Sequence, residues 1–221
     1  SGLGIMAISA AAKEAGIKVL LTGDGADECF GGYSWYAHLN ETVRSEINLQ
    51  ENPFSFQNFG SSLKDRLNIL GQMTPSLRAW AWHYYAHEDE KKKLFSEDWQ
   101  DGLNSSLRYF ESLENSAEPI DFIRHDRNFY FPFEMLRKVD RMGMANSVEG
   151  RTPFAAPSVL SLSERLDYGH MVRDKDLKWV LRRAFEDIVP MQVVNRPKHG
   201  FNVPIDHWLK NEWSDLRTRW A

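Results

Sequence analysis

The stretch "VLLTGDGADECFGGYSWY", residues 19–36, takes the chain from an apolar segment directly into a glycine-rich turn. Residues 17–21 are apolar and partly β-branched, which predicts a buried strand of a parallel sheet. The turn that follows holds the carboxylates of Asp24, Asp27 and Glu28 among four glycines. Like charges repel one another and repel phosphate, so the turn is either a solvated surface loop or the site of a cation.

The glycines of this turn support the interpretation that it binds a ligand. Glycine lets backbone N–H groups approach a ligand closely, and consecutive N–H groups can bind an anion. In doubly wound α/β proteins, ligands bind at the carboxyl ends of the strands, which is where this turn lies. Mg²⁺ prefers carboxylate oxygens and often bridges to nucleotide phosphates, so it would reconcile the acids with an anionic ligand. A nucleotide with magnesium is therefore the functional hypothesis for residues 22–33.

The composition narrows the class of protein. The chain has 221 residues, with 27 basic and 31 acidic side chains, which argues against nucleic-acid binding through a general basic excess. The single cysteine, Cys29, excludes an internal disulfide and fits a reducing, cytoplasmic location. No apolar run approaches the roughly 20 residues that span a bilayer, so we expect no membrane segment. Because the chain opens within a helical pattern, we expect it to be a fragment of a longer protein.

The remaining sequence predicts a mainly helical fold with one or few parallel strands. A helix over residues 4–15 should end at Gly16 and lead into the strand, as in half of an α/β unit. No second strand of equal strength follows. Residues 41–70 lack a clear pattern and are predicted to be a mobile surface segment. Further helices are expected over 74–95, over 117–131, over 133–150 opened by Pro132 and closed by Gly150, from Asp174 to the stop at Pro190, and from Pro204.

The expected helix after Pro132 carries a dense set of charges. Met135, Val139 and Met142 share one stripe, and a second stripe is charged. The charges are either an exposed face with ion pairs or the polar lining of a cleft that holds a charged substrate. The turn "VEGRTPF" follows and adds two more charges. The charged residues of this region are Glu134, Arg137, Lys138, Asp140, Arg141, Glu149 and Arg151.

A third candidate is the basic loop "VNRPKHGFNVP", residues 194–204. Pro197 and Gly200 bracket Lys198 and His199. A loop lysine near a nucleotide can neutralise charge that develops on a transferring phosphoryl group. His199 is interpreted as a solvated loop residue.

Taken in this order, the three stretches resemble the synthetase domain of the glutamine-dependent asparagine synthetases. "LTGDGADECFGGY" is similar to that family's loop Ser/Thr-Gly-Asp/Glu-Gly-x-Asp-Glu-x-Phe-Gly-Gly-Tyr. "LRKVDRMGMANSVEGRTPF" is similar to its Lys-x-Asp-Arg helix and Glu-x-Arg-x-Pro-Phe turn, and "RPKHGFNVP" to its basic loop. The resemblance spans residues 17 to 210. It implies a remnant of an α/β adenine-nucleotide α-hydrolase-like domain, with residues 1–36 as a partial nucleotide-binding segment and 37–221 as its helical part.

The resemblance also implies a reaction. ATP adenylates the side-chain carboxylate of aspartate or a related acid, and ammonia from a glutaminase domain attacks the acyl-adenylate to give the amide. By the resemblance, Asp27 holds Mg²⁺, and Lys198 stabilises the adenylation transition state. Asp24 and Glu134 are the other candidate catalytic residues. The nucleotide side would include Thr22, Gly23, Asp24 and Gly25, and the acceptor side Lys138, Asp140, Arg141 and Arg151.

The sequence departs from the family pattern in two ways. The pyrophosphate-binding loop of Ser-Gly-Gly-x-Asp-Ser type and the N-terminal cysteine nucleophile are absent, so we expect this chain alone to be inactive and to bind ATP weakly. Ala155-Ala156 follows Pro-Phe where the family often has Leu-Asp. Two alternatives therefore stay open: an amide ligase for another carboxylate, and a non-catalytic helical interaction domain. The strand could pair with itself in a homodimer or lie buried between helices.

Overall fold

The computed structural model describes residues 2–40, 88–102, 118–196 and 203–215, with the isolated positions 109, 112, 113 and 219. The described part is mostly helical and contains a two-stranded parallel sheet. The prediction of a mainly helical fold with few parallel strands is confirmed. The expected features over residues 41–70 and the first part of the helix expected over 74–95 lie outside the described residues.

The chain divides into two compact units. Unit 1 comprises residues 1–22, 136–151 and 189–221, and unit 2 comprises residues 23–135 and 152–188. The domain boundary expected after residue 36 stays a prediction. The elements of unit 1 are α1 (Gly2–Glu14), β1 (Val19–Leu21), α9 (Arg137–Met144), β2 (Glu149–Arg151), α13 (Met191–Val194) and α14 (Ile205–Lys210). Those of unit 2 are α2 (Ala26–Phe30), η1 (Ser34–His38), α6 (Glu88–Leu94), η3 (Glu97–Gly102), α8 (Pro119–His125), the greater part of η4 (Asp126–Leu136), η5 (Pro153–Ala155), α10 (Pro157–Glu164), α11 (Tyr168–Met171) and α12 (Trp179–Ala184).

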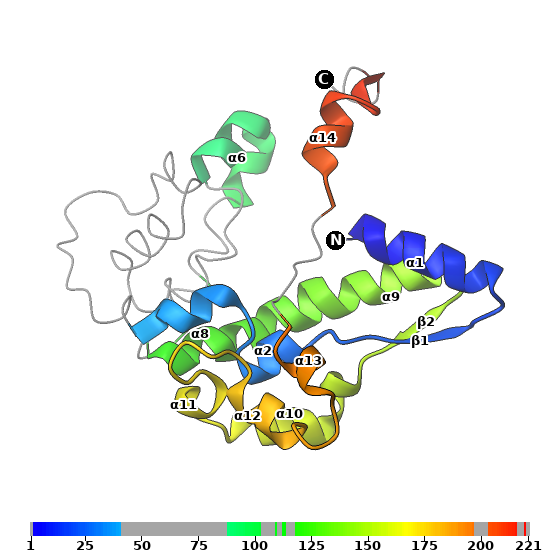
Figure 1. Ribbon diagram of the computed structural model, residues 1–221. Helices are drawn as coiled ribbons and strands as arrows, with labels where there is room; N and C mark the ends of the chain where they lie inside the picture. The colour runs from blue at the N-terminus through cyan, green and yellow to red at the C-terminus, as the bar shows by residue number, and fades with distance from the viewer. Residues whose placement is uncertain are drawn as a thin grey trace. The chain divides into compact units, whose positions relative to one another are not determined.

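The sheet of unit 1 pairs β1 with β2 in parallel, and α1 lies along α9 beside it (Figure 1). Leu20 is opposite Gly150 in the register. A Cβ on Gly150 would overlap the Val139 side chain, so the glycine lets α9 pack closely on β2. The sequence did not locate β2, because "EGR" has little intrinsic strand preference and forms a strand only through its pairing with β1.

The expectation that residues 17–21 form a buried strand is wrong as regards burial. The side chain of Leu21 is 78 % exposed and that of Val19 is 39 % exposed. The only strand paired with β1 in the described residues is β2, so one edge of β1 has no strand beside it. The apolar run predicted the strand correctly, and its low burial follows from the narrow sheet.

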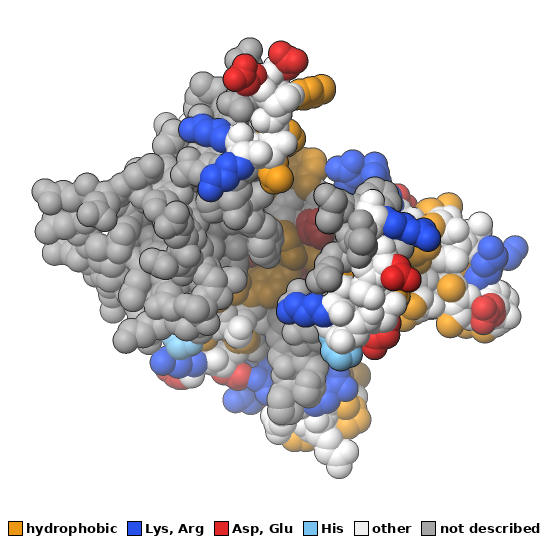
Figure 2. Space-filling model, turned by 90° about the horizontal axis from the view of Figure 1, so that it is seen from above, with side chains coloured by type: hydrophobic (Ala, Val, Ile, Leu, Met, Phe, Trp, Pro, Cys, Tyr) orange, Lys and Arg blue, Asp and Glu red, His pale blue; other side chains and the backbone are white. Residues whose placement is uncertain are grey.

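The surface of α1 also carries apolar side chains. Leu3, Met6 and Ile8 are 42–49 % exposed. Figure 2 shows hydrophobic side chains between charged ones on the right of the view, where α1 lies. Even so, among the residues that the structure describes, no helix is both long enough and apolar enough to cross a membrane.

The core of unit 2 is aromatic. Tyr36, Phe122 and Ile123 are completely buried, and Trp35 and Phe131 are nearly so. The Trp35 ring lies edge-on to Phe122, with ring centroids 6.0 Å apart. These residues come from η1, α8 and η4, so the core joins the segment after the glycine-rich turn to the helices that follow residue 118.

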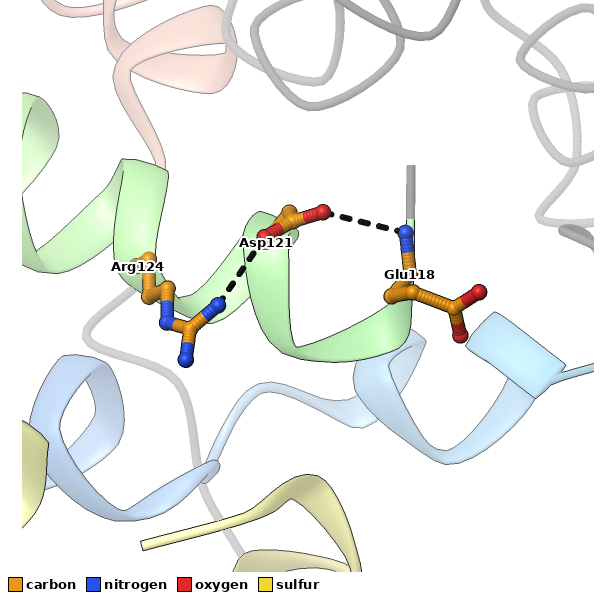
Figure 3. Close-up of polar contacts among 3 residues, drawn as sticks. All are labelled: Glu118, Asp121 and Arg124. Atoms are coloured by element: carbon orange, nitrogen blue, oxygen red, sulfur yellow. Dashed lines mark hydrogen bonds and ion pairs between the residues drawn. The ribbon is translucent and has the colours of Figure 1, made fainter. Parts of the chain in front are cut away.

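The N-terminus of α8 is stabilised by local hydrogen bonds (Figure 3). The Asp121 carboxylate accepts a hydrogen bond from the backbone N–H of Glu118 at 3.1 Å and another from the Arg124 guanidinium at 3.2 Å. Pro119 occupies the first turn, where its missing N–H costs nothing. These interactions explain why the helix begins at this position.

Two predicted boundaries around α9 are wrong. Pro132 does not open a new helix but lies inside η4, an 11-residue π-helical segment. A wider π turn moves aside the carbonyl with which the proline ring would clash in an α-helix. Gly150 does not close the helix either, because α9 ends at Met144. Ser147 adopts a left-handed φ of 58°, and the Val148 N–H returns to the Gly143 carbonyl at 3.1 Å.

The helix expected from Asp174 to Pro190 is shorter than predicted. Asp174 and Lys175 have φ values of 50° and 67°, which are incompatible with a right-handed helix. The helix α12 therefore starts at Trp179 and ends at Ala184. The short helix expected from Pro204 is confirmed as α14.

Candidate functional site

The candidate site centres on residues 23–33, which we call the acidic loop. Two of its glycines have left-handed backbone conformations, with φ of 89° at Gly25 and 72° at Gly31. A Cβ on Gly25 would overlap the Phe131 ring, and one on Gly31 would come within 2.8 Å of Met171 Cβ. Both positions therefore require glycine for the backbone conformation and for the close packing.

Asp27 is held by the backbone and by a lysine. Its carbonyl accepts hydrogen bonds from the N–H groups of Gly31 and Gly32, each at 2.9 Å. Its carboxylate Oδ1 lies 2.7 Å from Lys178 Nζ, and the two side chains are 23 % and 28 % exposed. A Cβ on Gly32 would overlap both Asp27 Oδ1 and Lys178 Cε. The loop therefore forms a cradle whose shape depends on the absence of a side chain at Gly32.

Glu28, the next residue, points into the core. It is 1 % exposed and accepts a hydrogen bond of 2.5 Å from the Tyr33 hydroxyl. Burial raises the pKa of the Glu28 carboxyl, against the lowering effect of the Tyr33 hydrogen bond. Burial, together with the Glu28 charge, also raises the pKa of Tyr33. Of the adjacent acids Asp27 and Glu28, only Asp27 is thus partly exposed to solvent.

A second buried pair lies behind the loop. The Tyr36 hydroxyl donates a hydrogen bond to Asp126 Oδ2, and both residues are completely buried. The Tyr36 carbonyl accepts a hydrogen bond from the Tyr168 hydroxyl at 2.5 Å. Burial also raises the pKa of the Cys29 thiol to about 11, so this thiol is protonated at neutral pH. These groups anchor the loop in the core of unit 2.

The predicted residues of unit 1 lie on the sheet and on α9. The Thr22 N–H donates to the Arg151 carbonyl at 2.8 Å, so the ends of β1 and β2 are adjacent. Arg151 Nε and Nη2 donate to the two Glu149 oxygens at 3.0 and 3.2 Å. The two side chains are 61 % and 54 % exposed, and the hydrogen bonds lower the pKa of Glu149. Arg151, predicted to bind substrate, thus has an intramolecular partner in this structure.

The charges of the α9 region are largely at the surface. Asp140 and Arg141 are exposed, whereas Val139 on the other face is 3 % exposed. Lys138 is partly buried, and its Cγ would lie 3.9 Å from a Cβ on Gly2 of α1. The predicted division into an apolar and a charged stripe is therefore visible on α9. Glu134 is exposed on η4, in unit 2.

The structure therefore places one group of predicted site residues in each unit. Gly23, Asp24, Gly25 and Asp27 belong to a single loop of unit 2, while Lys198 lies outside the described residues. Two residues near the loop, Lys178 and Asp126, were not singled out from the sequence, because they come from distant segments and have no local signal. The sequence identified Glu28 as one of the three acids of the turn but did not predict that it is buried. The predicted residues of unit 1 are Thr22, Lys138, Asp140, Arg141 and Arg151.

The donor set of the loop fits a magnesium ion held jointly with phosphate. Mg²⁺ usually takes one or two protein carboxylates and completes its shell with water and phosphate oxygens. Asp27 supplies such a carboxylate on a cradle with no side chain at Gly32. Among the described positions, no group of three or more His, Cys, Asp or Glu residues could hold a metal without such a partner.

Comparison with known proteins gives the family. Residues 1–220 match the family model described as asparagine synthase. The chain is 34 % identical over 206 residues to the "Putative asparagine synthetase (glutamine-hydrolyzing)" of Mycobacterium tuberculosis, covering 88 % of this chain and 31 % of that protein. It is 30 % identical over 224 residues to asparagine synthetase (glutamine-hydrolyzing) 1 of Bacillus subtilis, covering 92 % and 34 %.

The chain spans about a third of the length of these curated relatives. No solved structure matches it. The family model covers almost every residue, including both units and the acidic loop. The resemblance drawn from the three motifs is therefore confirmed, and the chain belongs to the asparagine synthase family.

Proposed function

We propose that this chain is the C-terminal part of a glutamine-hydrolysing asparagine synthetase, an ATP-dependent carbon–nitrogen ligase. The observation that carries the proposal is the acidic loop, in which the Gly31 and Gly32 N–H groups bind the Asp27 backbone carbonyl and the missing side chain at Gly32 leaves room for the Asp27 carboxylate. Family membership supports ATP and an amide-forming reaction. We further propose that the β1–β2 pair is part of an α/β adenine-nucleotide α-hydrolase-like sheet.

The proposed reaction has two steps. The side-chain carboxylate of aspartate attacks the α-phosphorus of ATP, and pyrophosphate leaves with the electrons of the broken P–O bond. Ammonia from glutamine then attacks the acyl carbon, loses a proton, and releases AMP to give asparagine. Each step exchanges one acyl or phosphoryl partner for another without a change in oxidation state.

The residues of this chain bind and orient the reactants in the proposal. Thr22, Gly23, Asp24 and Gly25 face the nucleotide, where backbone N–H groups can approach its phosphates. Asp27 would hold Mg²⁺, which when bound neutralises polyphosphate charge. Lys198 would stabilise the charge that develops on the α-phosphoryl group and on the departing pyrophosphate. We assign the acceptor side to Glu134, Lys138, Asp140, Arg141 and Arg151.

The test is amide formation by the full-length protein with ATP, glutamine and a series of carboxylic acids. Asparagine and AMP should form in equal amounts with aspartate, and Lys198→Met should lower kcat by at least about a hundredfold. Arg183→Met, which removes a positive charge from an exposed pair with Glu186, serves as the matched control and should retain activity.

The acceptor series separates the remaining alternatives. If another acid gave AMP and aspartate did not, asparagine synthesis would be excluded and a related ligase supported. If no acid gave AMP, an interaction domain would be favoured. A cytoplasmic location and a homodimer remain predictions from the sequence.

A further inference from the structure

Lys178 contacts the acidic loop through both its side chain and its backbone. Its Nζ lies 2.7 Å from Asp27 Oδ1, and its backbone N–H donates to the Gly31 carbonyl at 3.2 Å. The residue has a left-handed φ of 54° and immediately precedes α12. The chain thus turns sharply at the position from which the lysine reaches the carboxylate.

The ion pair between Lys178 and Asp27 is partly buried. The two side chains are only 28 % and 23 % exposed, so water screens their attraction less than it would on an open surface. The Lys178 side chain passes through the space that a Cβ on Gly32 would occupy. Lys178 and Asp27 therefore meet in a place that the glycine leaves open.

This arrangement has a consequence for cation binding. A divalent cation on the Asp27 carboxylate would lie close to the Lys178 ammonium, and the two positive charges would repel each other. The ammonium must then move away, or a polyanion must offset the added charge. A free cation should therefore bind Asp27 more weakly than it would if Lys178 were absent.

We propose that Lys178 is a positioning residue that competes with divalent cations for Asp27. It holds the carboxylate in place while no cation is bound, and it keeps the acidic loop from binding free cations tightly. A cation that arrives with an anionic phosphate group brings its own compensating charge and meets a smaller barrier. This inference rests on the proposed function only in assigning a divalent cation to Asp27.

The first test measures Mn²⁺ binding to the 221-residue chain by electron paramagnetic resonance, without nucleotide. Lys178→Met removes the competing charge and should bind Mn²⁺ about fivefold more tightly than the native chain at moderate ionic strength. Arg183→Met removes one positive charge from α12, which follows Lys178, at a 62 % exposed side chain, and its affinity should stay near the native value. The double variant Asp27→Asn with Lys178→Met should lose the tighter binding.

The second test uses the native chain and so does not depend on the folding of a variant. Acetylation of lysines, followed by mass spectrometry, should show that Mn²⁺ makes Lys178 more reactive, because its ammonium leaves the carboxylate. The reactivity of the exposed Lys13 on α1 should not change.

Any one of the following results would overturn the inference. They are equal Mn²⁺ affinity of the native chain and Lys178→Met, tight binding that survives Asp27→Asn, and acetylation of Lys178 that does not respond to Mn²⁺. Absence of Mn²⁺ binding to every variant would also overturn it. None of these results bears on amide formation, which the release of AMP tests separately.

Discussion

The acidic loop of unit 2 and the strand pair of unit 1 both carry charged family motifs, but they hold their charges differently. Asp27 of the loop and its partner Lys178 are 23 % and 28 % exposed, and backbone hydrogen bonds join both residues to the loop glycines. On β2, Glu149 and Arg151 are 54 % and 61 % exposed and contact each other across one intervening residue. Substitutions in and around the loop should therefore change the stability of the fold. Substitutions of the strand charges should leave stability nearly unchanged and alter ligand binding instead.

Gly25→Ala should give the largest loss of stability. The substitution places a Cβ at a φ of 89° and against the buried Phe131 ring, so backbone strain and overpacking add. We expect the free energy of unfolding to fall by about 3–4 kcal/mol, measured by urea denaturation. Gly16→Ala is the matched control in unit 1, because its φ is 73° but no atom lies within 4 Å of the new Cβ. It should cost only about 1 kcal/mol, and equal losses at the two sites would contradict the role given to packing.

Tyr36→Phe should have the next largest effect. The substitution leaves the completely buried Asp126 carboxylate without its hydroxyl donor, and the expected cost is about 2 kcal/mol. Tyr168→Phe removes a hydroxyl from a neutral carbonyl acceptor instead and should cost about 1 kcal/mol. Denaturation midpoints of the two variants give the comparison. A smaller loss for Tyr36→Phe than for Tyr168→Phe would show that the buried carboxylate is not what makes this network important.

Glu28→Gln should alter the pH dependence of stability. Burial raises the pKa of Glu28 in the folded state above its ordinary value of 4.5, so the unfolded chain loses this proton first as pH rises. Unfolding then becomes progressively more favourable from about pH 4.5 up to the folded-state pKa, by at most about 1.4 kcal/mol for each pH unit.

The glutamine cannot ionise, and its carbonyl can still accept the Tyr33 hydrogen bond. The variant should therefore gain stability relative to the native chain across this pH range and keep a constant difference above it. Urea midpoints measured at intervals from pH 4 to 8 test this expectation. Parallel curves for the two proteins would mean that Glu28 has the same pKa in both states.

The sequence predicted the parts of these regions that depend on local pattern. The apolar run before Thr22 located β1, and the glycines located the turn that follows it. The position of β2 depends on pairing between residues 19–21 and 149–151, which no local preference encodes. The Lys178 contact likewise depends on two segments that meet only in the folded chain. Burial of Glu28 accompanies the packing of α2 against α8, α10 and α12, which the local sequence does not encode.

Arg151→Met should have the smallest effect on stability and the most specific effect on function. The Glu149 and Arg151 side chains are 54 % and 61 % exposed, and salt screens the pair, so the denaturation midpoint should not change measurably. In the full-length ligase, the same substitution should raise KM for the carboxylate acceptor more than it lowers kcat, because Arg151 is proposed to bind the acceptor. Lys18→Met, at an exposed position just before β1, is the control and should change neither parameter. A loss of stability without a change in KM would instead place Arg151 among the residues that maintain the fold, and the distinction between the loop and the strand would no longer hold.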